Sequence, residues 1–448
     1  MVDLVIIGAG PGGYETALLA AKHNFKVVLI EKNEVGGTCL QAGCIPTKTL
    51  YRNAEVLELV KESHQFGITH ENIQFDYAAV KKRKDEVISE LTTGIKYSLE
   101  KANVELIYGE GYILDPHHVY VGKRKIETKY ILIATGSKEY RLPISGIDLP
   151  NVLTSKELLD IDHVPKRLTI IGAGYIGCEF ASIFSAFGSK VTLVEYMDSI
   201  VPLLDTEVSK RLHALMKRSG ITIHTKTKVL GIEQSDESLV VKAVCKDKEL
   251  LLPSDTVLLA TGRQSVLDME SLNEANILHD YKKILVNEHF QTNIESIYAI
   301  GDVVGGKMLA HVASFQGQVA LAHMLGQKRD IDFNFVPSAM FTFPEVASIG
   351  YTEEEVITKN IPYHVCKYLF RANGKAMALK ETDGFAKLIV NHQEQIIGAH
   401  IIGPHASDLI HEIGALMKLG VGVKAYLDLI HAHPTLSEVV QEAIRTLE

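Results

Sequence analysis

A pattern that occurs twice constrains the fold of this chain more than any other feature. The first copy, DLVIIGAGPGGYETALLAAKHNFKVVLIE, lies at the N-terminus, and the second, LTIIGAGYIGCEFASIFSAFGSKVTLVE, lies further along. Each copy predicts a buried strand, a glycine turn, a helix and a second strand that ends in an acid, which together form a βαβ unit. The glycines and the acid have the same spacing in both copies: Gly8, Gly10, Gly13 and Glu31 in the first, and Gly172, Gly174, Gly177 and Glu195 in the second.

This pattern is typical of a site that binds a dinucleotide. The glycines permit a tight turn and a close approach of the backbone to a pyrophosphate, the helix N-terminus supplies amides, and the acid accepts hydrogen bonds from ribose hydroxyls. One glycine triplet is weak support, because it also occurs in an ordinary tight turn between a strand and a helix. Two triplets at identical spacing favour an α/β fold with two Rossmann-like dinucleotide-binding domains of the three-layer ββα type.

Further segments extend the two units. The apolar runs YILIATGS and TVLLATGR both end in Ala-Thr-Gly, as expected for matched closing strands that meet a turn beside a ligand. SIYAIGD ends in Asp302, an acid that could bind a polyol or a ribose, or cap a turn instead. A helix is predicted in KMLAHVASFQGQVALAHML, which follows it. Beyond residue 330, short strands and helices without a phosphate motif predict a separate α+β domain.

The composition is that of a folded multidomain protein, with 46% hydrophobic and 23% charged residues among 448. No apolar run approaches the ~20 residues of a membrane helix, and the chain enters its first strand directly after Met1 without a signal segment. The basic cluster KKRK at 81–84 is followed by Asp85 and Glu86, which favours a solvated helix face over a nucleic-acid patch. We therefore expect a cytoplasmic protein that binds neither nucleic acid nor membrane.

Two of the five cysteines, Cys39 and Cys44, lie close together in GGTCLQAGCIPTK. They could form a structural staple, half of a zinc site or a redox pair, or be inert thiols. A disulfide between them would close a small ring, which gains little loop entropy but suits a reversible redox switch. Pro46 suits the first turn of a helix, whose N-terminus would stabilise a Cys44 thiolate. Because no second Cys or His pair with ligand spacing is nearby, a redox pair is favoured and no metal site is predicted.

The segment HAHPTLSE near the C-terminus allows two interpretations. Thr435 and Glu438 match a capping box, in which the threonine caps a helix and the glutamate returns a bond to the cap amide. Alternatively, Glu438 orients His433 as a base that works near neutral pH. The sequence leaves both interpretations open, and His431 is a second candidate for the base.

These features occur together, and in this order, in the class I pyridine nucleotide-disulphide oxidoreductases. The chain resembles this family over essentially its whole length, and the motifs G-G-T-C-x-x-x-G-C-I-P-x-K and H-P-T-x-S-E are highly specific. Between the two cysteines, relatives read Leu-Asn-Val-Gly, whereas this chain has Leu-Gln-Ala-Gly, with Gln41 and Ala42 as the differences. Within the family, the resemblance is greatest to the enzymes that oxidise dihydrolipoamide.

The resemblance implies two cofactors and four segments. These are an FAD-binding domain at 1–140, an NAD-binding domain at 141–264, a central segment at 265–330 that completes the FAD domain, and an interface domain at 331–448 that forms a homodimer. The residues implied for FAD are Gly8, Gly10, Gly13, Glu31, Lys48, Gly111, Thr135, Gly136, Asp302, Ala310 and His311. Those implied for NAD are Gly172, Gly174, Gly177, Glu195, Val229 and Gly262.

The resemblance also assigns roles around the cysteine pair. Cys39 would exchange with the dithiol substrate, and Cys44 would contact the flavin. Lys48 would lie by the flavin and pair with Glu179. By position alone, the same two residues could be a surface lysine and an acid that stabilises a helix dipole.

In the resembling family, the interface domain delivers its histidine across the dimer, so His433 would be the base and Glu438 would orient it. Electrons would pass from dihydrolipoamide, carried on a lipoyl-bearing protein of a 2-oxo acid dehydrogenase or glycine-cleavage complex, through the disulfide and FAD to NAD. Alternatives are a mercuric reductase, a glutathione reductase, or a flavin-bearing interaction subunit without turnover. The first should carry a second cysteine pair near its C-terminus, yet no cysteine follows Cys366. The second would need basic residues where Glu195 stands.

Overall fold

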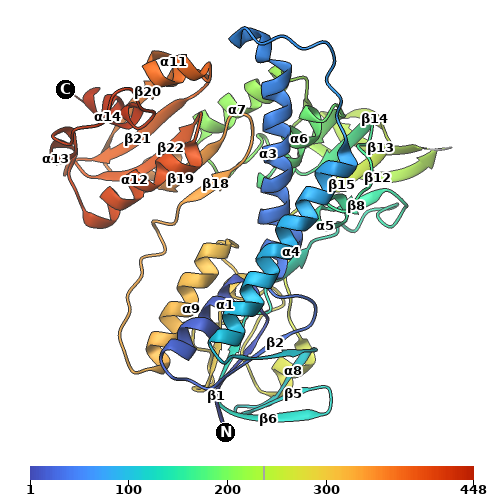
Figure 1. The fold of residues 1–448 in the computed structure, drawn as a ribbon, viewed down its shortest axis with the longest axis vertical. Helices are drawn as coiled ribbons and strands as arrows, with labels where there is room; N and C mark the ends of the chain where they lie inside the picture. Colours follow the sequence, from blue (N-terminus) through green and yellow to red (C-terminus); the bar gives the residue numbers. More distant parts are fainter. Residues whose placement is uncertain (236–237, 448) are drawn as a thin grey trace.

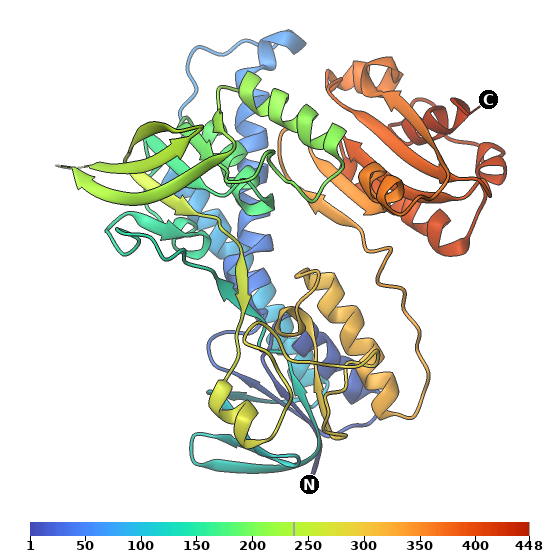
Figure 2. The same ribbon diagram turned by 180° about the vertical axis from the view of Figure 1, so that it is seen from behind.

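The computed structural model describes residues 1–235 and 238–447, which form three parts with separate main sheets. In Figure 1, the first part lies at the bottom, the second at the upper right and the C-terminal part at the upper left. The long helix α3 (Cys44–Lys61) runs upward from the first part and lies beside the second. Figure 2 shows the same three parts from behind, with the extended chain that leads from the first part into the C-terminal part.

The first part is built on a seven-stranded sheet in the order β3-β2-β1-β6-β5-β4, with β17 paired to β6. Strands β3, β2, β1, β6 and β17 are parallel neighbours, whereas β4, β5 and β6 pair antiparallel. Helices α1 and α9 lie side by side against the sheet, which explains why β1 and β2 are almost fully buried (Figure 1). The elements are β1 (Val2–Ile7), α1 (Pro11–Lys22), β2 (Val27–Glu31), β3 (Glu105–Tyr108), β4 (Gly111–Asp115), β5 (His118–Val121), β6 (Arg124–Ile133), α8 (Met269–Glu274), β17 (Ile297–Ala299), η2 (Gly301–Val304) and α9 (Ala310–Met324).

The second part repeats the βαβ unit on a five-stranded parallel sheet, in the order β11-β10-β9-β15-β8. A three-stranded antiparallel sheet, β12-β13-β14, lies beside it, and the short antiparallel pair β7 and β16 links the first two parts. The elements are β7 (Ser137–Glu139), β8 (Val152–Thr154), α5 (Ser155–Leu158), β9 (Arg167–Ile171), α6 (Tyr175–Ala186), β10 (Lys190–Val194), α7 (Thr206–Arg218), β11 (Thr222–His224), β12 (Thr227–Ser235), β13 (Ser238–Cys245), β14 (Lys248–Ser254), β15 (Thr256–Leu259) and β16 (Arg263–Ser265). The two predicted closing strands, β6 and β15, each end directly before their Ala-Thr-Gly turn.

The C-terminal part has a five-stranded antiparallel sheet in the order β18-β19-β22-β21-β20. Helix α12 packs on β19 and β22, and α14 packs on β20 and β21. The elements are β18 (Ser338–Met340), β19 (Val346–Gly350), α10 (Glu353–Thr358), β20 (Tyr363–Leu369), η3 (Phe370–Ala372), α11 (Gly374–Leu379), β21 (Phe385–Asn391), β22 (Ile396–Ile402), α12 (Ala406–Leu419), α13 (Val423–Leu427) and α14 (Glu438–Arg445). The predicted fold class, with two parallel-sheet βαβ units and an α+β part, is confirmed.

A buried ion cluster fixes the C-terminal sheet to the second part. Lys387 Nζ on β21 lies 2.9 Å from Asp205 Oδ2 and 2.5 Å from Glu353 Oε2, and the lysine and Asp205 are both fully buried. Asp205 also caps α7 by accepting a hydrogen bond from the backbone N–H of Glu207. One carboxylate therefore begins a helix of the second part and neutralises a cation of the third.

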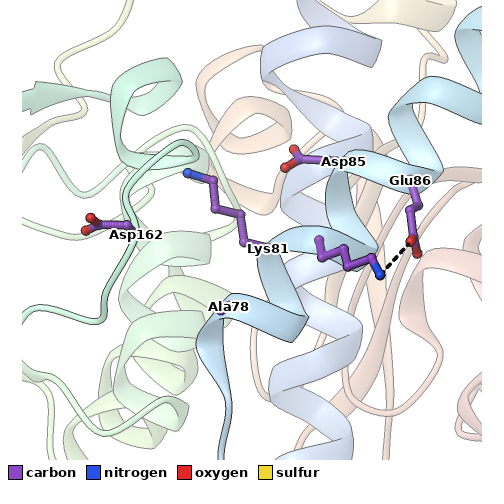
Figure 3. Close-up of a pocket in the computed structure, with 6 residues that line it drawn as sticks. Ala78, Lys81, Asp85, Glu86 and Asp162 are labelled. Atoms are coloured by element: carbon purple, nitrogen blue, oxygen red, sulfur yellow. Dashed lines mark ion pairs between the residues drawn. The ribbon is translucent and has the colours of Figure 1, made fainter.

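The remaining helices connect the first two parts. They are α2 (Gly37–Ala42), α3, the short η1 (Ser63–Phe66) and α4 (Tyr77–Lys101), which begins at the Asp76 cap. In Figure 3, the side chains of Lys81 and Asp85 extend from α4 toward the segment that carries Asp162, whereas Glu86 lies on the side of the helix away from Asp162. No helix within the described ranges is long and apolar enough to cross a membrane.

The predicted solvated face at 81–84 is wrong for Lys84. This side chain is only 1% exposed, and its ammonium donates hydrogen bonds to the Leu159 carbonyl and Asp160 Oδ1, at 2.9 and 3.1 Å. The cause is the docking of α4 against the end of α5, which needs a cation to satisfy a helix-end carbonyl. Lys82, by contrast, pairs with Glu86 at the surface, as the charge pattern suggested.

Candidate active site

The outer glycines of both triplets are required by the backbone itself. Gly8 and Gly172 have φ of 106° and 104°, and a Cβ on either would lie 2.3 Å from the carbonyl oxygen of the Ala-Thr-Gly turn. A Cβ on Gly13 or Gly177 would lie 1.9 Å from the carbonyl oxygen of the first glycine in its own unit. These four positions therefore allow the tight turn and the close packing of helix on strand.

The middle glycines have more room. A Cβ on Gly174 would meet no heavy atom of the described residues within 4 Å, and one on Gly10 would first meet the Cα of Gly37 at 4.0 Å. Since the fold does not exclude a side chain here, the space fits the close approach of a ligand pyrophosphate to the backbone. This arrangement fits the two dinucleotides that the resemblance implies.

The two acids occupy equivalent places. Glu31 accepts hydrogen bonds from the backbone N–H groups of Ala9 and Asn33, at 2.7 and 2.9 Å. Glu195 accepts from Ala173 and Met197, both at 2.7 Å. Each carboxylate thus spans its glycine turn and the end of its own strand, where a ribose would lie if a dinucleotide occupied the turn.

Two loops meet beside the first unit. Asp302, on η2, accepts a hydrogen bond from the Ser137 hydroxyl, and Arg263 Nε donates to the same hydroxyl oxygen at 2.7 Å. The Thr135 hydroxyl donates to the Val266 carbonyl at 2.9 Å, and Gly136 has φ of 71°. The bonds made by Ser137 and Arg263 were not predicted from the sequence, and they join the closing turns of the two units.

The other predicted cofactor residues lie at the edges of the two units. Gly111 begins β4, and a Cβ there would lie 3.1 Å from the Ile7 side chain. Ala310 opens α9, and His311 Nε2 lies 3.0 Å from the Pro337 carbonyl oxygen, in surroundings whose burial lowers the pKa of the imidazole. In the second unit, Val229 is half-buried on β12, and Gly262 has φ of 108°. Their roles toward FAD and NAD stay predictions.

The two cysteines lie on consecutive helices. Cys39 is in α2, Cys44 begins α3, and Gly43 separates the helices with φ of −145° and ψ of −114°. Both are thiols in this structure, Cys39 half-buried and Cys44 exposed. Pro46 stands in the first turn of α3, as predicted.

The surroundings favour a thiolate at Cys44. A hydrogen bond from the Cys39 thiol, together with the positive charge of Lys48, lowers the pKa of Cys44 to about 7. The same hydrogen bond, together with burial, raises the pKa of Cys39. One thiolate and one thiol are the state expected of a reduced redox pair near neutral pH.

Lys48 and Glu179 form an ion pair between the first two parts of the molecule. Lys48 Nζ on α3 lies 2.8 and 2.9 Å from the two carboxylate oxygens of Glu179 on α6. Glu179 also accepts the backbone N–H of Phe341 at 3.0 Å, and the ammonium lies 4.8 Å from the centre of the Phe341 ring. The lysine is half-buried beside the cysteine pair, so a simple surface position is excluded.

Glu438 makes the bond that each of the two interpretations assigns to the glutamate. Its Oε1 lies 2.9 Å from His433 Nδ1, and its Oε2 accepts the backbone N–H of Thr435 at 2.7 Å. These bonds lower the pKa of Glu438, the backbone bond more than the histidine. However, the helix begins at Glu438 with Ser437 as its cap, so the expectation that Thr435 caps it is wrong.

His431 differs from His433 in its surroundings. Its side chain is 7% exposed and its Nε2 lies 2.8 Å from Glu412 Oε1 and 3.1 Å from the Tyr426 hydroxyl. His433 has a side chain that is 77% exposed and directs its Nε2 away from its bonded carboxylate. The geometry therefore favours His433 over His431 as a base that meets a substrate.

The histidine and the cysteines are not brought together within one chain. Helices α13 and α14, which flank the His433 loop, lie at the outer edge of the C-terminal part, with its sheet between them and α3 (Figures 1 and 2). Among the described residues, no cluster of three or more His, Cys, Asp or Glu side chains could hold a metal ion.

Comparison with known proteins agrees with this geometry. Residues 2–317 match the family described as pyridine nucleotide-disulphide oxidoreductase, and residues 336–444 match its dimerisation domain. The chain is 37% identical to the mitochondrial dihydrolipoyl dehydrogenase of Pisum sativum, over 98% of this chain and 90% of that protein. It is also 37% identical to a dihydrolipoyl dehydrogenase of Bacillus subtilis, over 98% and 97%.

A solved structure of a flavoprotein disulfide reductase is similar to this chain over its whole length. The HOCl-induced flavoprotein disulfide reductase RclA from Escherichia coli superposes with a TM-score of 0.90 at 28% identity, covering 100% of both chains. Two family matches that together span most of the sequence, and relatives above 30% identity over nearly their whole length, show that this chain belongs to the pyridine nucleotide-disulphide oxidoreductase family.

Proposed function

We propose that this protein has the activity of an NAD-dependent dihydrolipoyl dehydrogenase (EC 1.8.1.4). The observation that carries the proposal is the cysteine pair at the junction of α2 and α3, with the ion pair of Lys48 and Glu179 beside it. Supporting it, the relatives at 37% identity are dihydrolipoyl dehydrogenases. The proposed carrier of the dithiol is a lipoyl-bearing protein of a 2-oxo acid dehydrogenase or glycine-cleavage complex.

The proposed exchange starts from the Cys39–Cys44 disulfide. One thiolate of dihydrolipoamide attacks Cys39 Sγ, which breaks the disulfide and releases Cys44 as a thiolate. The second substrate sulfur then attacks its partner in the mixed disulfide, which releases Cys39 and yields lipoamide. His433 accepts the proton of the attacking thiol, and Glu438 holds the imidazole. A bound FAD would supply the two-electron acceptor between the Cys39–Cys44 dithiol and NAD.

The residues that would hold FAD are the first glycine triplet with Glu31, Thr135, Gly136 and Asp302, and Gly111, Lys48, Ala310 and His311 would line the rest of its site. The second triplet with Glu195, Val229 and Gly262 would hold NAD. In this proposal, residues 1–140 form the FAD-binding domain and residues 141–264 the NAD-binding domain. Residues 265–330 form the central segment and residues 331–448 the interface domain.

NAD is preferred over NADP in this proposal because of the charges around Glu195. Its carboxylate can accept bonds from both ribose hydroxyls but would repel a 2'-phosphate. The three residues that directly follow Glu195, which are Tyr196, Met197 and Asp198, include no Arg or Lys that could compensate such a phosphate. The Lys226 ammonium lies 3.1 Å from Asp198 Oδ2 at the surface.

A steady-state assay tests the proposed substrate. The purified holoprotein should oxidise NADH with lipoamide, and should turn over glutathione disulfide or mercuric ion with a kcat/KM at least 10²-fold lower. Preference for glutathione disulfide or mercuric ion would replace the proposal with one of the other reductase activities. Absence of turnover with all three would support a flavin-bearing interaction subunit instead.

The shared active site has its own test. The match of residues 336–444 to a dimerisation domain supports a homodimer, in which His433 would reach the partner's cysteine pair. Two inactive variants, Cys44→Ser and His433→Gln, are mixed under conditions of subunit exchange. Each heterodimer keeps one intact pair, so about half of a dimer's activity should return. If exchange is proven and no activity returns, both groups belong to one subunit.

A further inference from the structure

The start of α2 is fixed to the first glycine turn. The backbone N–H of Gly36 donates to the Ala9 carbonyl at 2.8 Å. Gly37, with φ of 55°, packs so closely on the turn that a Cβ would lie 2.7 Å from the Cα of Gly10. This end of the helix that carries Cys39 is therefore held by backbone contacts.

The Gln41 side chain ties the other end of α2 to its surroundings. Gln41 Nε2 donates two hydrogen bonds, one to Thr92 Oγ1 and one to the Val35 carbonyl, both at 2.8 Å. Thr92 is buried in α4, so both N–H groups of one amide are used to tie α2 to a neighbouring helix and to its own preceding loop. Such paired bonds fix an orientation that a single contact would leave free.

The distance between the two sulfurs depends on this anchoring. Cys39 and Cys44 are on different helices, and Gly43 interrupts the helical backbone between them. A helix as short as α2, with six residues, has little stability of its own in water. The docking of α2, at Gly37 on one side and at Gln41 on the other, therefore adds to its packing on α3 in holding Cys39 near Cys44.

We propose that Gln41 is a positioning residue for the redox pair: its amide holds α2 against α4 and keeps Cys39 Sγ within bonding reach of Cys44 Sγ. Held in this way, the two thiols have a high effective concentration for each other, which favours the disulfide over the dithiol. The inference rests on the proposed redox function of the two cysteines and goes beyond it, because it assigns the control of their equilibrium to a residue outside the pair, whose amide bonds to Val35 and Thr92.

The expected effect follows from the exchange equilibrium. Dithiothreitol reduces the Cys39–Cys44 disulfide to two thiols and is itself oxidised to its cyclic disulfide, so two electrons and two protons are transferred. Without the Gln41 bonds, the disulfide should be three- to tenfold easier to reduce, since the thiols meet less often. A tenfold change corresponds to a reduction potential about 30 mV less negative.

The test measures this equilibrium in the holoprotein. Wild type and variants are equilibrated anaerobically with mixtures of oxidised and reduced dithiothreitol and then quenched by alkylation, and mass spectrometry counts the free thiols at Cys39 and Cys44. Gln41→Leu and Thr92→Val should both shift the equilibrium toward the dithiol, and the double variant should shift it less than the sum of the two. Thr92→Ser, which keeps the hydroxyl acceptor, should restore the wild-type value.

The neighbouring threonine provides a matched control. Thr93 is exposed on the same helix and donates to the Ser89 carbonyl of its own helix at 2.8 Å, so Thr93→Val should leave the equilibrium unchanged. An unchanged equilibrium in Gln41→Leu and in Thr92→Val, or an equal shift in Thr93→Val, would overturn the proposal. A lower Tm without a shift would also overturn it, because it would show a purely structural role. Failure of the wild type to form any Cys39–Cys44 disulfide would instead refute the proposed function.

Discussion

The two βαβ units of this protein are nearly identical in backbone geometry and differ in what lies against the middle glycine. In both units, the first glycine has φ close to 105°. The acid at the end of the second strand accepts a hydrogen bond, 2.7 Å long, from the backbone N–H of the residue that follows this glycine. In the first unit, Gly10 faces Gly37 at the start of the cysteine helix, whereas in the second, Gly174 faces open space within the described structure.

The difference separates what the fold requires from what the chemistry requires. Glycine is required at the outer positions because a Cβ there would clash with the backbone wherever a strand turns into a helix this tightly. The middle position has no such steric requirement, and it is where the surroundings of the two units differ. In the first unit, the same turn also supports the helix that carries Cys39, whereas the second unit has no such helix against its middle glycine.

The largest effect should come from placing a methyl group at the outer rather than the middle glycine. In Gly177→Ala and Gly13→Ala, the new Cβ would lie 1.9 Å from a backbone oxygen, so each should lower stability by several kcal/mol, about as much as severe core substitutions do. Thermal unfolding measures this. Gly174→Ala should keep the wild-type Tm but raise the KM for NADH at least tenfold. Equal Tm values for all three variants would contradict the division between fold and chemistry.

The two acids offer the next test. Glu195→Gln should reduce the preference for NADH over NADPH by on the order of 10², since the repulsion of a 2'-phosphate is removed. Glu31→Gln should leave that preference unchanged and instead weaken the retention of FAD, which gel filtration and flavin absorbance measure. Each carboxylate accepts two backbone N–H groups through its two oxygens, so each Gln variant keeps one of these bonds and loses the other. If Glu31→Gln altered the nucleotide preference, the assignment of the two units would be reversed.

The cysteine helix gives a smaller and more local effect. In Gly37→Ala, a Cβ 2.7 Å from Gly10 would push α2 away from the first turn. Reduction of the disulfide by dihydrolipoamide should slow about tenfold, as expected when reacting groups lose their alignment, while the KM for NADH stays the same. Stopped-flow absorbance measures the first quantity. Gly174→Ala should show the opposite pattern, which makes the two variants controls for each other.

The sequence predicted those features whose cause is local. A tight turn needs glycine at Gly8 and Gly172 whatever surrounds it, and the start of a helix at Cys44 follows from Pro46 and the preceding glycine. The sequence pattern alone did not predict which polar side chains that are far apart in the chain would pair with each other. The ion pair of Lys48 with Glu179 was suggested only by the resemblance to a known family.

The contacts that no pattern suggested share one physical origin. Gln41 meets Thr92, and Lys84 meets the Leu159 carbonyl, because separate helices dock together in three dimensions. Charge patterning along one helix assumes that its polar face meets water, and it fails where another element covers that face. The basic stretch at 81–84 contains both cases, since Lys82 is solvated and Lys84 is buried.

The smallest expected effect concerns the charges through which the second unit acts on the first. Lys48 belongs to the first part and lowers the pKa of Cys44, while Glu179 belongs to the second and raises it. A thiolate forms as the pH rises through the pKa, so alkylation of Cys44 in the dithiol form should increase with pH and reach half its maximum at about pH 7.

In Lys48→Gln, the stabilising cation is lost, so the midpoint of the alkylation profile should move to higher pH by about one unit. In Glu179→Gln, the opposing anion is lost, so the midpoint should move to lower pH by a similar or smaller amount. Iodoacetamide labelling against pH, followed by mass spectrometry at Cys44, measures both shifts. Midpoints that move in the same direction, or do not move, would show that the ion pair only joins the two parts and leaves the thiolate unaffected.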